Sequence, residues 1–146
     1  MGERILFAGI EAALVDFLSP RLAESAGAAV PVLMRIPDPR PSRFVRVSRN
    51  DRKGRLDVED QVGSRGANLI LDRPRVVFEC VDDSGGAADL AAKVRSIINA
   101  AAPGYLGTVW CDYVADAGEE NDIDPVTAAP RYTIVTDLIV RGKVLA

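Results

Sequence analysis

The side chain used most often for acid–base catalysis is absent from this chain, because none of its 146 residues is a histidine. This excludes Ser-His-Asp and Cys-His nucleophilic catalysis, imidazole general bases and every metal site that needs an imidazole ligand. The two cysteines, Cys80 and Cys111, are too few for a four-cysteine zinc site. Both lie in apolar stretches without a CxxC spacing, which predicts buried structural thiols rather than reactive ones.

Carboxylates are the remaining candidates for proton transfer or metal binding. Glu79 and Asp112 could form an acid–base pair, but their spacing does not show that they meet. Residues 116–124 hold five acidic residues without the Asp-x-Asp-x-Asp-Gly spacing of a calcium loop, which predicts a solvated loop or a partner contact. Residues 82–86, DDSGG, lack the Lys-Ser/Thr of a phosphate-binding loop and predict a turn with a helix cap. We therefore predict no catalytic residue, no metal, no cofactor and no enzymatic activity.

Arginine recurs at every third position through the middle of the chain, at residues 40, 43, 46, 49, 52 and 55. A period of three alternates between the two faces of a strand, so these side chains cannot form one continuous stripe. Two interpretations remain open: solvation of an exposed strand and loop, or contact with an acidic partner or a nucleic-acid backbone. No zinc finger, helix-turn-helix or RNP-type aromatic pattern accompanies the arginines, which argues against sequence-specific DNA reading.

The net charge of −3 conceals an uneven distribution of charge. Residues 35–75 carry eleven basic and six acidic groups, whereas residues 76–146 carry five basic and eleven acidic groups. A chain with a basic middle and an acidic end has a physical reason to bind copies of itself or a charged neighbour.

Hydrophobic periodicity predicts a single α+β domain over residues 1–146, with a core supplied by 48% hydrophobic residues. The sheet is expected to be mixed or antiparallel, with about five strands and two main helices packed on one face. Residues 50–68 predict one long charged loop, and no segment approaches the roughly 20 apolar residues of a membrane span. Pro20 leaves two possibilities for the first helix: a kink, or a second short helix capped by Ser19. The expected helices cover residues 10–26 and 87–101, and the expected strands cover 30–35, 44–49, 75–81, 108–115 and 131–140.

Residues 32–47, 72–80 and 130–133 form three blocks that, in this order, resemble the tail terminator proteins of long-tailed, siphovirus-type actinobacterial phages. Residues 32–47, VLMRIPDPRPSRFVRV, are similar to the family's Pro-x-Pro-Arg-Pro-x-Arg-Phe-Val-x-Val segment. Residues 72–80, DRPRVVFEC, and residues 130–133, PRYT, are similar to its second and third blocks. With the N-terminal helix, the resemblance spans nearly the whole chain.

The resemblance implies a tail-terminator-like fold and a homo-oligomeric ring, expected to be a hexamer, that caps the tail tube and stops its polymerisation. The implied partners are other copies of the chain, the major tail tube protein and a head-completion or connector protein, with DNA passing through the lumen without sequence-specific binding and no membrane. The implied location is the head-proximal end of the virion tail, after assembly in the host cytoplasm. The candidate assembly interface is Arg40, Arg43, Phe44, Arg46, Asp72 and Arg73, and the candidate tube- or lumen-facing loop residues are Arg49, Arg52, Lys53, Arg55 and Arg65.

Two alternatives to a terminator remain open at this point. The first is another head–tail joining protein, such as a stopper or adaptor ring, or a minor tail protein. The second, more distant, is a regulatory module that binds nucleic acid through the arginine series. Such a module predicts DNA affinity that falls steeply with salt.

Overall fold

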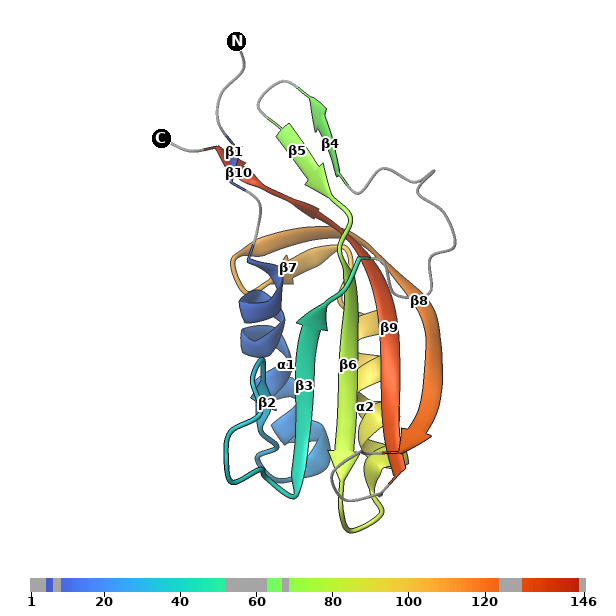
Figure 1. Cartoon of the computed structure of the whole chain (residues 1–146). Coiled ribbons are helices and arrows are strands. Elements are labelled where there is room, and N and C mark those ends of the chain that lie inside the picture. The colour runs from blue at the N-terminus through green and yellow to red at the C-terminus, as the bar shows by residue number, and fades with distance from the viewer. Residues whose placement is uncertain (1–4, 7–8, 52–62, 67–68, 124–129, 145–146) are drawn as a thin grey trace.

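A computed structural model describes residues 5–6, 9–51, 63–66, 69–123 and 130–144 of the chain. The described part of the chain contains two helices and ten strands, with five of the strands between the two helices (Figure 1). The helices are α1 (Ile10–Ala26) and α2 (Ala87–Asn99). The strands are β1 (Ile5–Leu6), β2 (Val32–Leu33), β3 (Arg43–Arg49), β4 (Gly63–Gly66), β5 (Leu69–Asp72), β6 (Arg75–Asp82), β7 (Gly104–Leu106), β8 (Val109–Ile123), β9 (Pro130–Arg141) and β10 (Lys143–Val144).

Eight of the described strands form one curled, mixed sheet, which confirms the predicted α+β class. Its long strands lie side by side in the order β3-β6-β9-β8, each antiparallel to its neighbour. Short β2 runs parallel to β3 at one edge, and β7 pairs with the start of β8 at the other. β1 and β10 form a separate two-stranded sheet. The described strands outnumber the five expected, because strands of two to four residues are too short to show a period of two.

Both helices pack on the same face of the sheet, as predicted (Figure 1). The apolar stripe of α2 is buried through Leu90, Ala91, Val94 and Ile98. Alternate residues of the long strands face the helices and complete the core, for example Val45 and Val47 on β3, Phe78 on β6, and Ile134 and Leu138 on β9. Neither α1 nor α2, the helices in the described part, is long and apolar enough to cross a membrane.

Helix α1 continues through Pro20, so no second short helix begins at Ser19. Proline has no N–H to donate to the carbonyl of Asp16, four residues earlier. Both residues lie on the exposed side of the helix, where water can hydrogen-bond to the freed carbonyl. Ser19 does not cap a new helix: its hydroxyl donates to the carbonyl of Val15 at 2.7 Å. The helix ends at Gly27, whose φ of 73° is the left-handed conformation of a C-terminal cap.

Two stretches predicted as loops are partly strand. Within residues 50–68, the segment Gly63–Gly66 forms β4 and pairs with β5 in a hairpin that extends beyond the end of the main sheet (Figure 1). The predicted acidic loop at residues 116–124 continues β8 as far as Ile123, in register with β9 from Thr136 to Pro130. Neither stretch shows an alternation of apolar and polar residues, because neither has an apolar face to bury. This part of β8 is an edge strand, and its charged residues discourage pairing with other chains.

Strands β5 and β6 form one line beside β9. Asp72 pairs with Val140 and Arg75 pairs with Asp137, so the register is unchanged across the two residues between the strands. The interruption is Pro74, which has no N–H to give to the ladder, although its carbonyl accepts a hydrogen bond from Leu138 at 3.0 Å. The projecting hairpin therefore shares its backbone directly with a central strand of the core.

Candidate assembly surface

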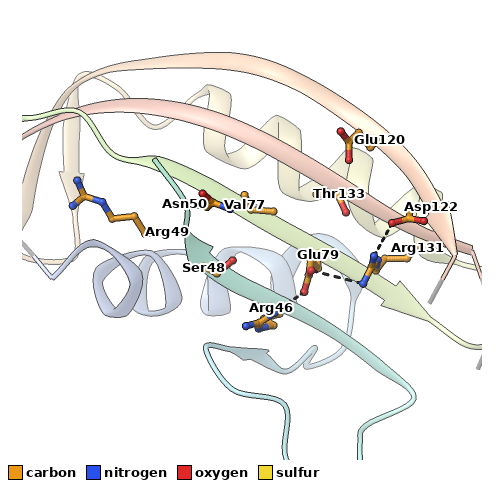
Figure 2. A pocket seen from close by; sticks show the side chains of 10 residues that line it. All are labelled: Arg46, Ser48, Arg49, Asn50, Val77, Glu79, Glu120, Asp122, Arg131 and Thr133. Atoms are coloured by element: carbon orange, nitrogen blue, oxygen red, sulfur yellow. Dashed lines mark hydrogen bonds and ion pairs between the residues drawn. The ribbon is translucent and has the colours of Figure 1, made fainter. Parts of the chain in front are cut away.

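Charged side chains form a continuous chain of ion pairs across the face of the sheet that lies opposite the helices. Arg46 on β3 approaches Glu79 on β6 at 3.2 Å, and Glu79 lies 3.7 Å from Arg131 on β9 (Figure 2). Arg131 in turn reaches Asp122 on β8 at 2.7 Å. Oppositely charged side chains on neighbouring strands stabilise the pairing of those strands. The ion pairs on this face therefore stabilise the sheet.

An open hollow of about 360 Å³ lies over this ion-pair chain. Its lining combines three arginines and three carboxylates with polar side chains such as Ser48 and Thr133 (Figure 2). Small-molecule sites are mostly apolar with a few directed polar groups, whereas this lining is polar and balanced in charge. In the described ranges, no group of three or more acidic or cysteine side chains is arranged to hold a metal ion. The geometry favours a protein-contact surface over a substrate pocket.

The guanidinium of Arg40 covers an apolar side chain on this helix-free face. Phe44 is 1% exposed although it points away from the helices, and Val81, opposite it on β6, is also buried. The Arg40 guanidinium lies 5.3 Å from the centre of the Phe44 ring. It also donates two hydrogen bonds of 3.0 Å to the carboxylate of Asp83, which hold it there. A guanidinium over the face of an aromatic ring is attracted by the electrons of the ring, so this contact is a cation–π interaction.

Arg49 and Asp72 form the most enclosed ion pair of the site. The Arg49 guanidinium donates to both oxygens of Asp72, at 2.6 and 2.8 Å, and to both oxygens of Asp51, at 2.9 Å each. Asp72 is only 1% exposed. Burial opposes the charge on Arg49, but the hydrogen bonds and attraction of Asp72 and Asp51 outweigh it and raise the pKa of Arg49. This cluster ties the end of β3 to the β5–β6 line.

These positions correct several sequence-based expectations. Asp72 and Phe44 were expected on the assembly surface, but both are buried. Arg49 ends β3, as the predicted strand 44–49 requires, but its guanidinium, grouped with the tube- or lumen-facing residues, is held within the chain by Asp51 and Asp72. The pairing of strands decides which carboxylate each arginine meets. Composition does not reveal this pairing, for example that of β3 with β6.

The other expected arginines are mostly paired within the chain. Arg40 contacts Asp83, Arg43 lies 3.6 Å from Asp82, and Arg46 contacts Glu79. The basic middle therefore meets the acidic end inside one molecule, whereas the sequence had favoured a meeting between neighbouring copies. Arg73 is exposed. Arg52, Lys53 and Arg55 lie outside the described residues, and Arg65 lies in β4, with its side chain outside the description.

An exposed aromatic cluster was not expected from the sequence. Strict alternation along β8 would place Tyr113 on the core side with Cys111, but a bulge between these two residues moves Tyr113 to the opposite face. Trp110 lies on the same strand and pairs with Tyr105 across the hairpin, and we call these three residues the aromatic cluster. The rings of Tyr105 and Trp110 meet edge to face, with centroids 5.0 Å apart. A bulge leaves no signal in residue types, so the sequence could not have revealed this cluster.

Both cysteines are buried in the core, as the sequence predicted. Burial raises the pKa of Cys80 to about 12, and the carboxylates of Glu119 and Glu79 add to the effect. Burial also raises the pKa of Cys111, against smaller opposing effects of backbone hydrogen bonds at Tyr113 and Ile139. Neither thiol is activated as a nucleophile.

Comparison with known proteins relates this fold to one solved assembly. No family model and no curated protein matches the chain. A chain in the structure described as the virion of a native gene transfer agent particle is 18% identical, with a TM-score of 0.60. The match covers 91% of this chain and 95% of that one. The two chains therefore share one α+β fold over almost their whole length.

Proposed function

We propose that this protein is a structural component of a phage-like virion, and specifically the tail terminator that closes the tail tube. The observation that carries the proposal is the fold shared, over nearly the full length of both chains, with a chain of a gene transfer agent virion. The resemblance of residues 32–47, 72–80 and 130–133 to tail terminators points the same way from the sequence.

The site fits an assembly role better than a chemical one. Its polar hollow is balanced in charge, and both cysteine thiols are buried. The ion pairs fix the side chains of a wide sheet face, which gives a rigid surface for repeated contacts between subunits. We accordingly propose that the protein is not an enzyme and that it acts as a ring of identical subunits, expected to be a hexamer, between the tail tube and the head connector.

A length assay on tail tubes tests this function directly. Purified protein is added to polymerising major tail protein, and tube lengths and ends are measured by electron microscopy. We expect rings at one end of each tube and a narrow distribution of lengths. A protein that stays monomeric and leaves tube length uncontrolled would overturn the proposal.

Cross-linking inside the assembled particle distinguishes a terminator from a stopper or adaptor ring. A terminator is expected to cross-link to the major tail tube protein. Cross-links to the portal-side connector alone would assign the chain to the head side of the joint instead.

A further inference from the structure

The exposed aromatic cluster has the properties of an interface anchor. Tyr105 is 64% exposed and Tyr113 is 55% exposed, although large aromatic rings gain most from burial. The Trp110 Nε1 donates to Asp112 at 3.0 Å, and Arg141 donates two hydrogen bonds to the same carboxylate, at 2.8 and 2.9 Å. Trp110 is therefore held in place before any partner arrives, and the Tyr105 ring packs edge to face against it. Preordered aromatic residues of this kind carry much of the affinity of protein interfaces.

A second exposed apolar feature lies in the loop between β2 and β3, residues 34–42. Met34 and Ile36 are each 44% exposed, on either side of the exposed Arg35. Prolines at 37, 39 and 41 restrict the backbone of the loop. Both ends are anchored as well: Arg46 Nε donates to the Met34 carbonyl at 3.4 Å, and the Asp83 N–H donates to the Ser42 carbonyl at 2.9 Å. The loop is a stiff, apolar projection, which loses little entropy on docking.

The two features lie at different levels along the sheet. The loop starts beside the middle of β3, because Met34 follows Leu33, the partner of Arg46, and it then runs to the Arg43 end of β3. The loop enters β3 at Arg43, and Phe44 of β3 lies across β6 from the Arg131 end of β9. The aromatic cluster lies beside the other end of β9, where Cys111 pairs with Val140. Nine residues of extended β9 separate the two levels, roughly 30 Å. Figure 1 shows the same separation between the β2–β3 turn and β7.

We infer that the β2–β3 loop of one copy docks on the Tyr105–Trp110–Tyr113 cluster of the next copy. The chemistry of the two surfaces is complementary: proline and methionine pack favourably on aromatic rings, and the Arg35 guanidinium can lie over a ring face. Because the two surfaces differ, the contact is head-to-tail, and repeating it generates a closed ring when the rotation per subunit allows. The inference rests on the proposed ring function and names the surfaces that form the ring.

Engineered cysteines test this contact, because the native thiols are buried and contribute little background. Ile36→Cys and Tyr113→Cys proteins are mixed and oxidised mildly, and products are separated without reductant. We expect a disulfide-linked dimer that contains one copy of each variant. The matched control pairs Ala92→Cys, exposed on α2, with Tyr113→Cys, and no comparable dimer is expected.

A binding measurement complements the cross-link. We expect Tyr105→Ala to weaken self-association by roughly tenfold or more, with the melting temperature nearly unchanged because Tyr105 is exposed. Rings that form without the Ile36–Tyr113 cross-link would overturn the contact and leave the terminator function intact. A specific cross-link in a protein that forms no ring on tail tubes would support the contact and overturn the function. A cluster that cross-links only to a different virion protein would overturn the inference.

Discussion

The Arg49 guanidinium holds both carboxylate oxygens of Asp72, at 2.6 and 2.8 Å, and thereby joins the end of β3 to the bend between β5 and β6. Asp72 is almost completely removed from water, so the pair resembles a buried salt bridge more than a surface one. The loss of one partner would therefore leave an unpaired buried charge and lower the free energy of unfolding.

Replacing Arg49 with methionine should destabilise the protein strongly, because it leaves the buried carboxylate of Asp72 without its cation. We expect the free energy of unfolding, measured by urea denaturation, to fall by about 3 kcal/mol. The control is Lys93→Met, which removes an exposed pair with Asp89 on α2 and should cost only a few tenths of a kcal/mol. Similar losses in the two variants would show that the enclosure of Asp72 has no energetic consequence.

The pairing of the basic middle with the acidic end inside one chain can be tested at Arg75 and Asp137. These residues lie directly opposite each other on β6 and β9, joined by hydrogen bonds of 2.7 and 2.6 Å. Arg75→Glu and Asp137→Arg should each destabilise the monomer, and the double variant should recover stability. We expect a coupling free energy on the order of 1 kcal/mol in a double-mutant cycle. Additive losses, with no recovery, would contradict pairing within the chain.

Asp112 should make the stability of the protein depend on pH. The hydrogen bonds from Arg141 lower the pKa of Asp112 in the folded protein, against a smaller opposing effect of burial. A lowered folded-state pKa means that this contribution is fully present above the ordinary aspartate pKa of about 4 and is lost as the pH falls through the lowered value.

The measurement compares the unfolding free energies of the wild type and of Asp112→Asn between pH 2 and pH 6. The difference should be largest at pH 6 and shrink on acidification. Arg141→Gln removes the same interaction from the other side and should show the same pH dependence. A difference that stays constant with pH in either variant would contradict this account.

The buried thiols should resist modification in the folded protein. Burial raises the pKa of Cys80 to about 12, so very little of this thiol is ionised at pH 8, and the surrounding core residues also block access to it. We expect Ellman's reagent to react with neither native thiol in buffer, with both in urea, and rapidly with the added thiol of Ala92→Cys. Fast reaction of a native thiol in buffer would show that the core opens at Cys80 or Cys111.

Elements that bury a regular apolar face were predictable from the sequence. The stripe of α2 and the alternation from Tyr132 to Val140 in β9 follow directly from periods of 3.6 and 2, and the structure confirms both. The second half of β8 was not predictable. Its residues are acidic, and their strand conformation comes from pairing with β9 rather than from a preference of their own.

The candidate site was less predictable than the fold, because it depends on register. Asp72 and Phe44 look like surface residues beside so many arginines, yet Arg49 encloses the first and Arg40 covers the second. Which carboxylate an arginine meets is set by strand neighbours distant in sequence, as with Arg46 and Glu79. A single sequence shows which residues are charged, but it does not show which of them form ion pairs.

The unbroken register of β5 and β6 against β9 has a mechanical consequence. A force applied to the projecting hairpin along the strand direction passes through Pro74 into β6, which lies between two antiparallel neighbours. Separation then requires many ladder hydrogen bonds to shear at once rather than to open one at a time. A chain pulled by its hairpin would therefore resist unfolding along the strand direction.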